Sequence, residues 1–138
     1  MLSLTGGMKY VYCEGNVSFH YKWEGLESYI KYVLGENPRS GKVFIFMHKS
    51  RRQLRVFYYE RNGYILSEKK LDGPYRFIKP VFDVKKQKYN ICWADFVFLL
   101  EDTVITKVYL TETARRTGAA NKPNQTIDEY SFNPWTAF

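Results

Sequence analysis

The chain has 138 residues, of which 45% are hydrophobic and 25% charged, and its net charge is +7. This size fits one ordinary domain, and the composition is that of a soluble globular protein, which excludes a wholly disordered chain. No apolar run approaches the roughly 20 residues that cross a bilayer, so we expect a cytoplasmic protein with no membrane partner. Cys13 and Cys92 are too few for a disulfide framework, and we expect buried thiols, with a disulfide as the minority alternative.

The first elements in chain order are a strand and a helix. Residues 8–13 form a short β-prone run, and residues 14–18 are typical of a turn. After residue 22 the apolar residues recur at helical spacing, at Trp23, Leu26, Ile30 and Val33. This pattern predicts an amphipathic helix with one apolar face, which Gly35 ends in a left-handed cap.

A series of strands follows the helix. Residues 42–48 are apolar at both alternating sets of positions, which predicts a central strand covered on both faces. Residues 54–60 and 64–71 form two more strands joined by a turn at residues 61–63, in which Asn62-Gly63 is the residue pair most typical of a tight hairpin. A short fourth run follows at residues 75–78. These spacings predict an antiparallel meander with tight connections.

The remaining part of the chain contains one more helix and one more strand. Residues 81–89 form a polar, lysine-rich connection. Apolar residues then share one face of a predicted helix over residues 93–102, at Trp93, Phe96, Val97 and Leu100. Residues 104–110 predict a last strand.

The order of these elements predicts an α+β fold, because the strands are gathered together in the sequence. We expect an antiparallel β-meander of about four to six strands packed with two helices. Residues 1–110 would form this single domain. Residues 111–138 are rich in Thr, Asn, Ala, Gly and Pro, and they bury too little apolar area to offset their ordering entropy, which predicts a flexible C-terminal tail.

The positive charge is concentrated in the middle of the chain. Residues 39–88 include 14 basic and 4 acidic residues, a net charge of +10, whereas the rest of the chain carries −3. A localised basic surface attracts polyanions, because each neutralised phosphate releases condensed counterions. Nucleic acid is the commonest such partner, and a solvated face that only keeps the protein soluble is the alternative.

The sharpest basic feature is a turn between two predicted strands, where residues 49–52 read Lys-Ser-Arg-Arg. Antiparallel pairing would bring cations of the neighbouring strands to the same edge or face. The predicted phosphate contacts are Lys49, Arg51, Arg52, Arg55, Lys69, Lys70 and Arg76. Aromatic residues are interleaved among them and could stack on bases, but they are also good strand formers, so we assign them mostly to packing. These residues are Phe57, Tyr58, Tyr59, Tyr64 and Tyr75.

Residues that could carry catalysis are sparse. The sequence has no P-loop, no dinucleotide-binding motif and no nucleophile elbow. His48 stands beside several cations, so we expect a surface or phosphate-contacting role for it, and an ordinary loop or helix-start position for His20. The carboxylates available for two-metal chemistry are in solvated patterns, at Asp83, Asp95, Glu101 and Asp102. We therefore expect neither an enzyme nor a bound metal or other cofactor.

The order of many small motifs resembles one known family. Residues 37–46 read Asn-Pro-Arg-Ser-Gly-Lys-Val-Phe-Ile-Phe, and the basic turn, residues 54–59, the Asn-Gly turn and a Gly-Pro-Tyr-Arg-Phe run at residues 73–77 follow. These motifs resemble the small accessory protein encoded beside the transposase in IS66-type insertion sequences. That protein is the second open reading frame product, called TnpB in that family and distinct from the RNA-guided nuclease of the same name. The resemblance covers roughly residues 11–102.

The resemblance implies a role in transposition. Strand cutting and joining would belong to a separate, larger transposase, and this chain would be a non-catalytic helper. The transposase and other proteins of the same element are therefore implied partners. Residues 18–22 depart from the pattern of the family, which carries Asp-Met-Arg-Lys-Gly there, and the residues after 110 have no counterpart in it.

Three functional hypotheses follow from the sequence. The first is a DNA-associated accessory subunit that contacts phosphates through the cations named above. The second is a protein-interaction module that recruits or positions the transposase without contacting DNA, through the aromatic tail or an exposed strand edge. The third and weakest is a nuclease-like enzyme, in which Asp83 or Glu101 would hold a divalent metal ion.

Overall fold

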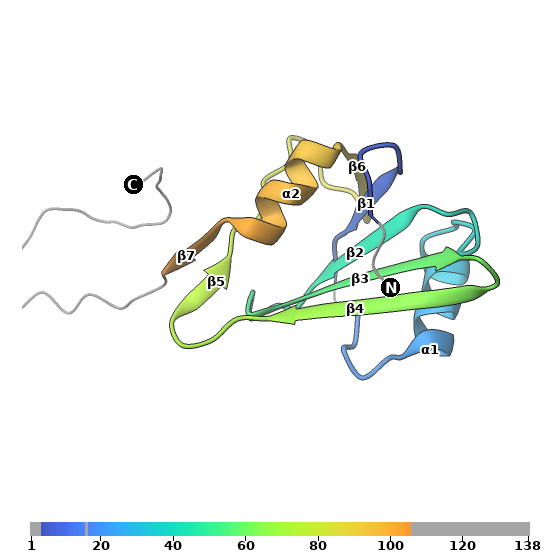
Figure 1. Cartoon of the computed structure of the whole chain (residues 1–138), viewed down its shortest axis with the longest axis horizontal. Coiled ribbons are helices and arrows are strands. Elements are labelled where there is room, and N and C mark those ends of the chain that lie inside the picture. Colours follow the sequence, from blue (N-terminus) through green and yellow to red (C-terminus); the bar gives the residue numbers. More distant parts are fainter. Residues whose placement is uncertain (1–3, 16, 106–138) are drawn as a thin grey trace, which may run out of the picture. The chain divides into compact units, whose positions relative to one another are not determined.

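The structure of the chain is a computed structural model that describes residues 4–15 and 17–105. Figure 1 shows its elements, which are, in chain order, β1 (Tyr10–Cys13), α1 (Trp23–Ser28), the π-helical η1 (Tyr29–Val33), β2 (Val43–Met47), β3 (Gln53–Glu60), β4 (Gly63–Lys70), β5 (Tyr75–Phe77), β6 (Lys88–Ile91), α2 (Trp93–Glu101) and β7 (Thr103–Ile105). The predicted tail at residues 111–138 and most of the predicted last strand lie outside the described residues. The domain boundary at residue 110 therefore stays a prediction.

The described strands form two sheets. The larger has five strands in the order β4-β3-β2-β1-β6, and β5 and β7 form the smaller one. All paired strands are antiparallel except β1 and β2. The predicted α+β class is confirmed, and β2, β3 and β4 form the predicted meander. The parallel pair was not predicted, and it arises because β1 is connected to β2 through a helix, which returns the chain to the same end of the sheet.

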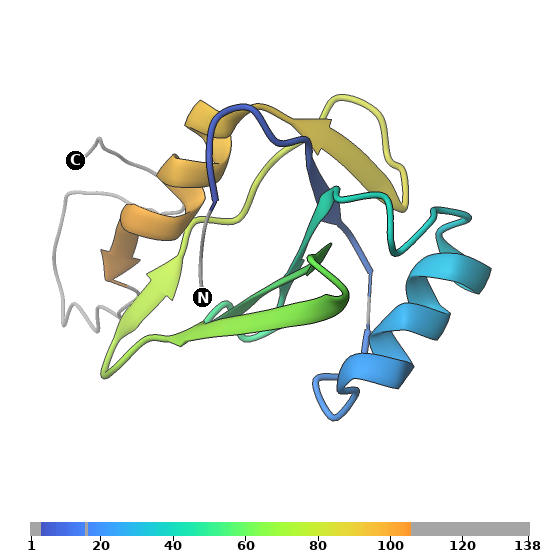
Figure 2. The same cartoon turned by 45° about the vertical axis from the view of Figure 1, so that its right-hand side comes forward.

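Alternation along the central strands separates two apolar cores. Val43 and Ile45 of β2 face one core, while Phe44 and Phe46 face the other, and all four are at most 1% exposed. The helical residues that complete the cores are Phe96 and Leu99 of α2 on the first face, and Leu26, Ile30 and Leu34 on the second. Figure 2 shows α1 and α2 on opposite sides of the five-stranded sheet. The prediction that residues 42–48 form a strand covered on both faces is confirmed.

The first helix changes its hydrogen-bonding pattern part-way along. At the end of η1 the Leu34 N–H donates to the Tyr29 carbonyl, five residues back, at 3.1 Å. A π-helical turn is wider than an α-helical turn, so it shifts which residue faces the core. Leu34 is consequently buried, whereas Val33, predicted for the apolar face, is 47% exposed. Trp23 at the first helical position is equally exposed, so the predicted helix is confirmed but its buried face is Leu26, Ile30 and Leu34.

The predicted hairpin between β3 and β4 is confirmed, and its turn is one residue shorter than the predicted residues 61–63. Glu60 pairs with Gly63, so the two central residues are Arg61 and Asn62, with φ of +50° and +68°. Positive φ at both positions is what the two-residue type I′ turn requires. The predicted turn at residues 61–63 therefore includes both central residues, and its last residue, Gly63, instead begins β4. The register of β3 decides this, because a shift by one residue would send each of its buried side chains to the opposite face.

The second half of the described chain departs from the predicted meander at β5 and β6. β5 pairs with β7 in the small sheet, and β6 adds to the large sheet beside β1. Only Tyr89 and Ile91 of β6 pack against a core. An edge strand needs little apolar sequence, which is why the lysine-rich stretch was predicted as a connection. The predicted second helix is confirmed, and the residues that it buries are Phe96 and Leu99.

Candidate nucleic-acid interface

The predicted basic turn joins β2 to β3 and is held by its own polar groups. The Arg51 N–H donates to the His48 carbonyl at 2.8 Å, which closes a β-turn. The Ser50 N–H donates to Nδ1 of His48 at 3.0 Å, and the Ser50 hydroxyl lies 2.9 Å from the same nitrogen. The Arg52 N–H in turn donates to the Ser50 hydroxyl oxygen at 3.2 Å. His48 is thus a structural acceptor within the turn, and Lys49 is exposed.

Backbone hydrogen bonds bring two other segments to this turn. The Leu71 N–H, directly after β4, donates to the Arg52 carbonyl at 2.8 Å, and the Phe77 N–H of β5 donates to the Arg51 carbonyl at 2.7 Å. The turn, the end of β4 and β5 therefore belong to one region of the molecule. We call this region the basic end, and its cations are Lys49, Arg51, Arg52, Lys69, Lys70 and Arg76.

The two lysines at the end of β4 point to opposite faces of the sheet. Lys69 pairs with Leu54 and Lys70 with Gln53, and successive strand residues alternate in direction. The Lys69 ammonium donates to the Leu100 carbonyl at 2.8 Å, in the last turn of α2, where a cation complements the helix dipole. Lys69 therefore has a structural partner, whereas Lys70 is exposed.

Two arginines of the basic end are half-buried and each contacts a backbone carbonyl. Arg52 donates through Nη2 to Leu71 at 3.4 Å, and its Nε is buried and has no hydrogen-bond partner among the described residues. Arg76 donates through Nη1 to the Tyr75 carbonyl at 3.1 Å. A guanidinium carries five N–H donors, so each of these two hydrogen bonds occupies only one of the five donors of its arginine.

Arg55 is buried inside the protein, although the sequence predicts a phosphate contact there. Its side chain is 2% exposed, and Cζ lies 4.7 Å from the centre of the Phe19 ring. Nη1 donates to the Tyr21 carbonyl at 2.6 Å and Nη2 to the Phe19 carbonyl at 2.7 Å. Nε donates to Glu68 at 3.1 Å, which also neutralises the charge. Arg55 therefore holds residues 19–21 on the sheet and is out of reach of a ligand in solvent.

The interleaved aromatic residues divide between the cores and the surface. Phe57 and Tyr58 are fully buried. Tyr59 and Tyr64 are half-buried, and the Arg39 guanidinium lies 5.0 Å and 5.8 Å from the centres of their rings. Tyr75 is 44% exposed. Packing thus accounts for the central rings of the meander, as the strand propensity of aromatic residues favours.

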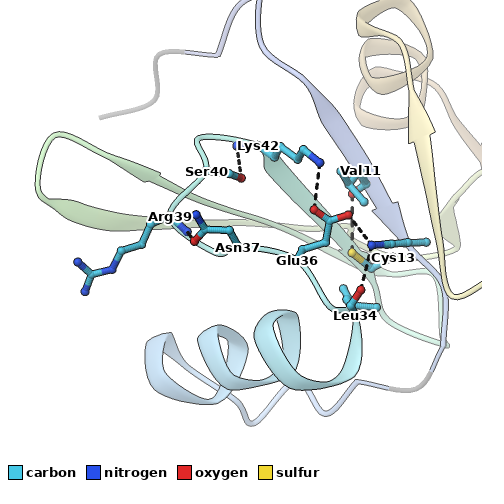
Figure 3. Close-up of polar contacts among 9 residues, drawn as sticks. Val11, Cys13, Leu34, Glu36, Asn37, Arg39, Ser40 and Lys42 are labelled. Atoms are coloured by element: carbon cyan, nitrogen blue, oxygen red, sulfur yellow. Dashed lines mark hydrogen bonds and ion pairs between the residues drawn. The ribbon is translucent and has the colours of Figure 1, made fainter.

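A second group of cations surrounds Glu36. A pocket of about 340 Å³ is lined there by Glu36, Lys42, Lys86, Gln87, Lys88 and Asn90. The Glu36 carboxylate accepts a hydrogen bond from Lys88 and one from Lys42 at 3.0 Å, and Figure 3 shows the contact with Lys42. These hydrogen bonds, that of Lys88 first, lower the pKa of Glu36 below its ordinary value. Because one carboxylate binds two of the lysines, this pocket is a weaker candidate for a polyanion than the basic end.

The carboxylates considered for metal chemistry are all exposed, namely Asp83, Asp95, Glu101 and Asp102. In residues 4–15 and 17–105, no group of three or more His, Cys, Asp or Glu residues could hold a metal ion. Both cysteines are free, and Cys13 is buried as predicted, which raises the pKa of its thiol. Cys92 is exposed, contrary to the prediction, because it precedes α2 at the surface. Among the described helices, none has the length and apolar character to span a bilayer.

Comparison with known protein families decides where the chain belongs. The family described as IS66 Orf2 like protein matches residues 8–109, which is most of the chain. The chain belongs to the IS66 Orf2-like family. The resemblance of the sequence motifs is thereby confirmed, and this IS66 Orf2-like protein belongs with the accessory proteins of IS66-type transposition. No curated protein and no solved structure matches it.

The matched region of the IS66 Orf2-like protein contains all of the elements described above, from β1 to β7. It therefore includes every cation of the basic end, together with the turn that organises them. The candidate interface belongs to the family's own part of the chain, and residues 110–138 follow the match.

Sequence reasoning missed one exposed segment of the IS66 Orf2-like protein. Residues 20–23 read His-Tyr-Lys-Trp, and all four residues are exposed. Tyr21 is 42% and Trp23 47% exposed. The helical periodicity had placed Trp23 on the apolar face, and large aromatic residues are usually buried. The available signal was a lysine between two aromatic residues, a pattern that nucleic-acid-binding surfaces share with ordinary helix starts.

Proposed function

We propose that this protein is a DNA-binding, non-catalytic accessory subunit of the transposition machinery that acts in the cytoplasm beside the transposase. The observation that carries the proposal is the basic end, where three segments contribute cations around one hydrogen-bonded turn. A polyanion gains most from such a group, because several phosphates release their counterions together. Membership of a transposition family supports DNA as that polyanion.

The contacts that we propose are to phosphates. Lys49 and Lys70 supply exposed ammonium groups. Arg51, Arg52 and Arg76 supply planar guanidinium groups, which match phosphate oxygens in pairs. Phosphate contacts position a protein on DNA but do not distinguish sequences. We therefore expect affinity for DNA of any sequence. Arg55 lies outside the proposed interface. Lys69 contributes positive charge to it while its ammonium group stays hydrogen-bonded to the Leu100 carbonyl of α2.

A salt titration of binding to a short DNA duplex, followed by fluorescence anisotropy, tests this proposal. We expect log Kd to rise linearly with log salt, with a slope of about 0.9 for each neutralised phosphate. The double substitution Lys49→Glu and Lys70→Glu should weaken binding to all duplexes alike and lower the slope by about 2. Substitution of these lysines is easier to interpret than substitution of Arg52, because Arg52 also donates a hydrogen bond to the Leu71 carbonyl and its loss could affect the fold.

A matched control separates the basic end from net charge. Lys9→Glu with Lys31→Glu makes the same change in charge at two exposed lysines, one before β1 and one on η1. We expect this control to retain most of the affinity and the slope. Equal losses in the two double variants, or no loss in either, would remove the basic end as the DNA contact.

The outer edge of β4 favours a second candidate function. β4 ends the large sheet, and the Leu71 N–H points to Arg52 beside β3. By alternation, the backbone groups directed away from β3 belong to Tyr64, Leu66, Glu68 and Lys70. Such an edge can accept a strand from another protein, which supports a module that recruits the transposase without contacting DNA. Co-purification of the transposase after complete nuclease digestion, together with failure to bind the duplex, would favour this function over the first.

A further inference from the structure

Residues 20–23 form an unusual surface for this protein, and we call them the aromatic segment. They read His-Tyr-Lys-Trp and are all exposed, whereas most aromatic rings of the central strands lie in the two cores. Glu24, the first acidic residue after them, lies in the first turn of α1. Tyr21 and Trp23, on either side of Lys22, leave apolar ring surface in contact with water, although large aromatic side chains are mostly buried in folded proteins.

The backbone of the aromatic segment is held in one conformation. The Tyr21 N–H donates to the Ser18 carbonyl at 3.2 Å, and the His20 N–H donates to the Ser18 hydroxyl at 3.1 Å. The buried Arg55 donates to the carbonyls of Phe19 and Tyr21. A ligand that binds here therefore meets a surface that is already ordered, which lowers the entropic cost of binding.

Gly25 indicates that the position of the Tyr21 ring matters. Glycine is an unfavourable residue inside a helix, yet it occupies the first turn of α1. A Cβ atom at this position would lie 2.8 Å from Cγ and 2.9 Å from Cβ of Tyr21. The helix therefore makes room for a ring that remains 42% exposed. If Tyr21 were a core residue, burial of its ring would offset the cost of a glycine in the helix. Because the ring is half-exposed, we take its fixed position as a sign that it contacts a partner in solution.

Phe19 connects the aromatic segment to the basic end. Its ring packs edge-on against the ring of His48, with 5.0 Å between their centres, and His48 begins the turn that carries Lys49. Arg55, which holds the segment, is paired with Glu68, two residues before Lys70 on the same face of β4. The segment that carries the exposed rings is thus joined, through Phe19 and Arg55, to the strand and turn that carry Lys70 and Lys49.

We propose that the aromatic segment is a stacking site for an unpaired DNA base, with Tyr21 as the stacking residue and Lys22 as an accompanying phosphate contact. The proposal rests on the proposed DNA-binding function and deepens it by naming single-stranded DNA as a ligand. An aromatic ring beside lysines fits a nucleotide, which offers a flat base and a phosphate together. A purely apolar protein surface would leave these cations without a partner. The bases of an intact duplex are already stacked, so the site would act on single strands, frayed ends or distorted duplex.

The test compares binding of the full chain to oligothymidylate and to a duplex of the same length. We expect Tyr21→Leu to weaken single-strand binding roughly 5- to 150-fold and to leave duplex binding nearly unchanged. Tyr21→Phe keeps the ring and should retain the affinity. The control is Tyr32→Leu, which removes a tyrosine that is 75% exposed on η1, and which should have no effect.

A second variant tests the position of the ring without removing it. Gly25→Ala should push Tyr21 out of place and weaken single-strand binding, while Gly63→Ala, which adds a Cβ with no atom within 4 Å among the described residues, should not. Photocrosslinking of an oligonucleotide that contains 5-iodouracil should attach to residues 20–23. Far-ultraviolet circular dichroism of each variant checks that it is folded.

The outcomes separate this proposal from the function on which it rests. Duplex binding that depends on Lys49 and Lys70, together with equal single-strand binding by wild type and Tyr21→Leu, overturns the stacking site alone. Absence of binding to any DNA overturns both. Loss of transposase co-purification in Tyr21→Leu with DNA binding intact would assign the segment to a protein partner and would also overturn the stacking site.

Discussion

At the scale of single residues, Arg55 shows how burial can reverse the role that a residue type suggests. It follows the basic turn by three positions and carries the same charge as the other predicted contacts. Alternation along β3 directs it to the α1 side of the sheet, where two carbonyls and a carboxylate bind its guanidinium. A buried charge is tolerated only when it is paired and hydrogen-bonded in this way.

We predict that Arg55→Met lowers the free energy of unfolding by about 3 kcal/mol, because it leaves the Phe19 and Tyr21 carbonyls and Glu68 without their donor. Urea denaturation monitored by circular dichroism measures this change. Glu68→Gln is the control and should cost less, since the amide oxygen of glutamine can still accept from Nε of Arg55 and the two carbonyl contacts of Arg55 remain. A loss below about 1 kcal/mol in Arg55→Met would contradict the buried role.

At the scale of elements, the β3–β4 hairpin is formed by a sequence that does not suit its turn perfectly. The left-handed conformation falls on Arg61 and Asn62 rather than on Asn62 and Gly63. Arginine in this conformation is unfavourable by roughly 1–2 kcal/mol relative to right-handed backbone, because its Cβ approaches the following carbonyl. The cross-strand pairs of β3 and β4 outweigh that local cost and set the position of the turn.

Replacing Arg61 by Asn and Asn62 by Gly should therefore raise the free energy of unfolding by on the order of 1 kcal/mol, because Asn-Gly is the preferred pair at these two positions. Thermal and urea denaturation both measure the gain. Gly63→Ala should have a small effect, since Gly63 has no positive φ and space surrounds the added carbon. A large loss in Gly63→Ala would place the turn centre at Asn62-Gly63 instead.

At the scale of the whole described molecule, one sheet separates two cores, and Glu36 connects segments that are distant in sequence. It follows η1 and binds Lys42, directly before β2, and Lys88 of β6. Its side chain is 15% exposed. The first helix is thereby tied to a central strand and to an edge strand of the same sheet.

This connection predicts a pH dependence of stability. Lys88 and Lys42 lower the pKa of Glu36 from its ordinary value of 4.5, so the stabilisation is complete above about that pH. It is lost as the pH falls through the lowered folded-state value, because the carboxylate becomes protonated in the native state as well. Urea denaturation at pH 7 and at successively lower pH should show wild type and Glu36→Gln converging in acid. A constant difference between them at all pH values would contradict the prediction.

The local sequence determined most of the secondary structure, the position of the basic turn and the family of this protein, because each of these depends on patterns within short stretches of the chain. The apolar run of β2, the periodicity of α2 and the cations of the turn at residues 49–52 are all legible there, and so is membership of the IS66 Orf2-like family. The β6 edge strand was missed, since a strand with one neighbour needs few apolar residues.

Only the tertiary structure decided which side chains face solvent. Arg55 and Lys70 are both strand cations, but the strand pairing buries one and exposes the other. The helical spacing predicts Trp23 on the apolar face, yet Trp23 is 47% exposed and the core on that side of the sheet takes Leu26, Ile30 and Leu34. The direction of a side chain depends on partners that are distant in the sequence, and residue type alone does not contain that information.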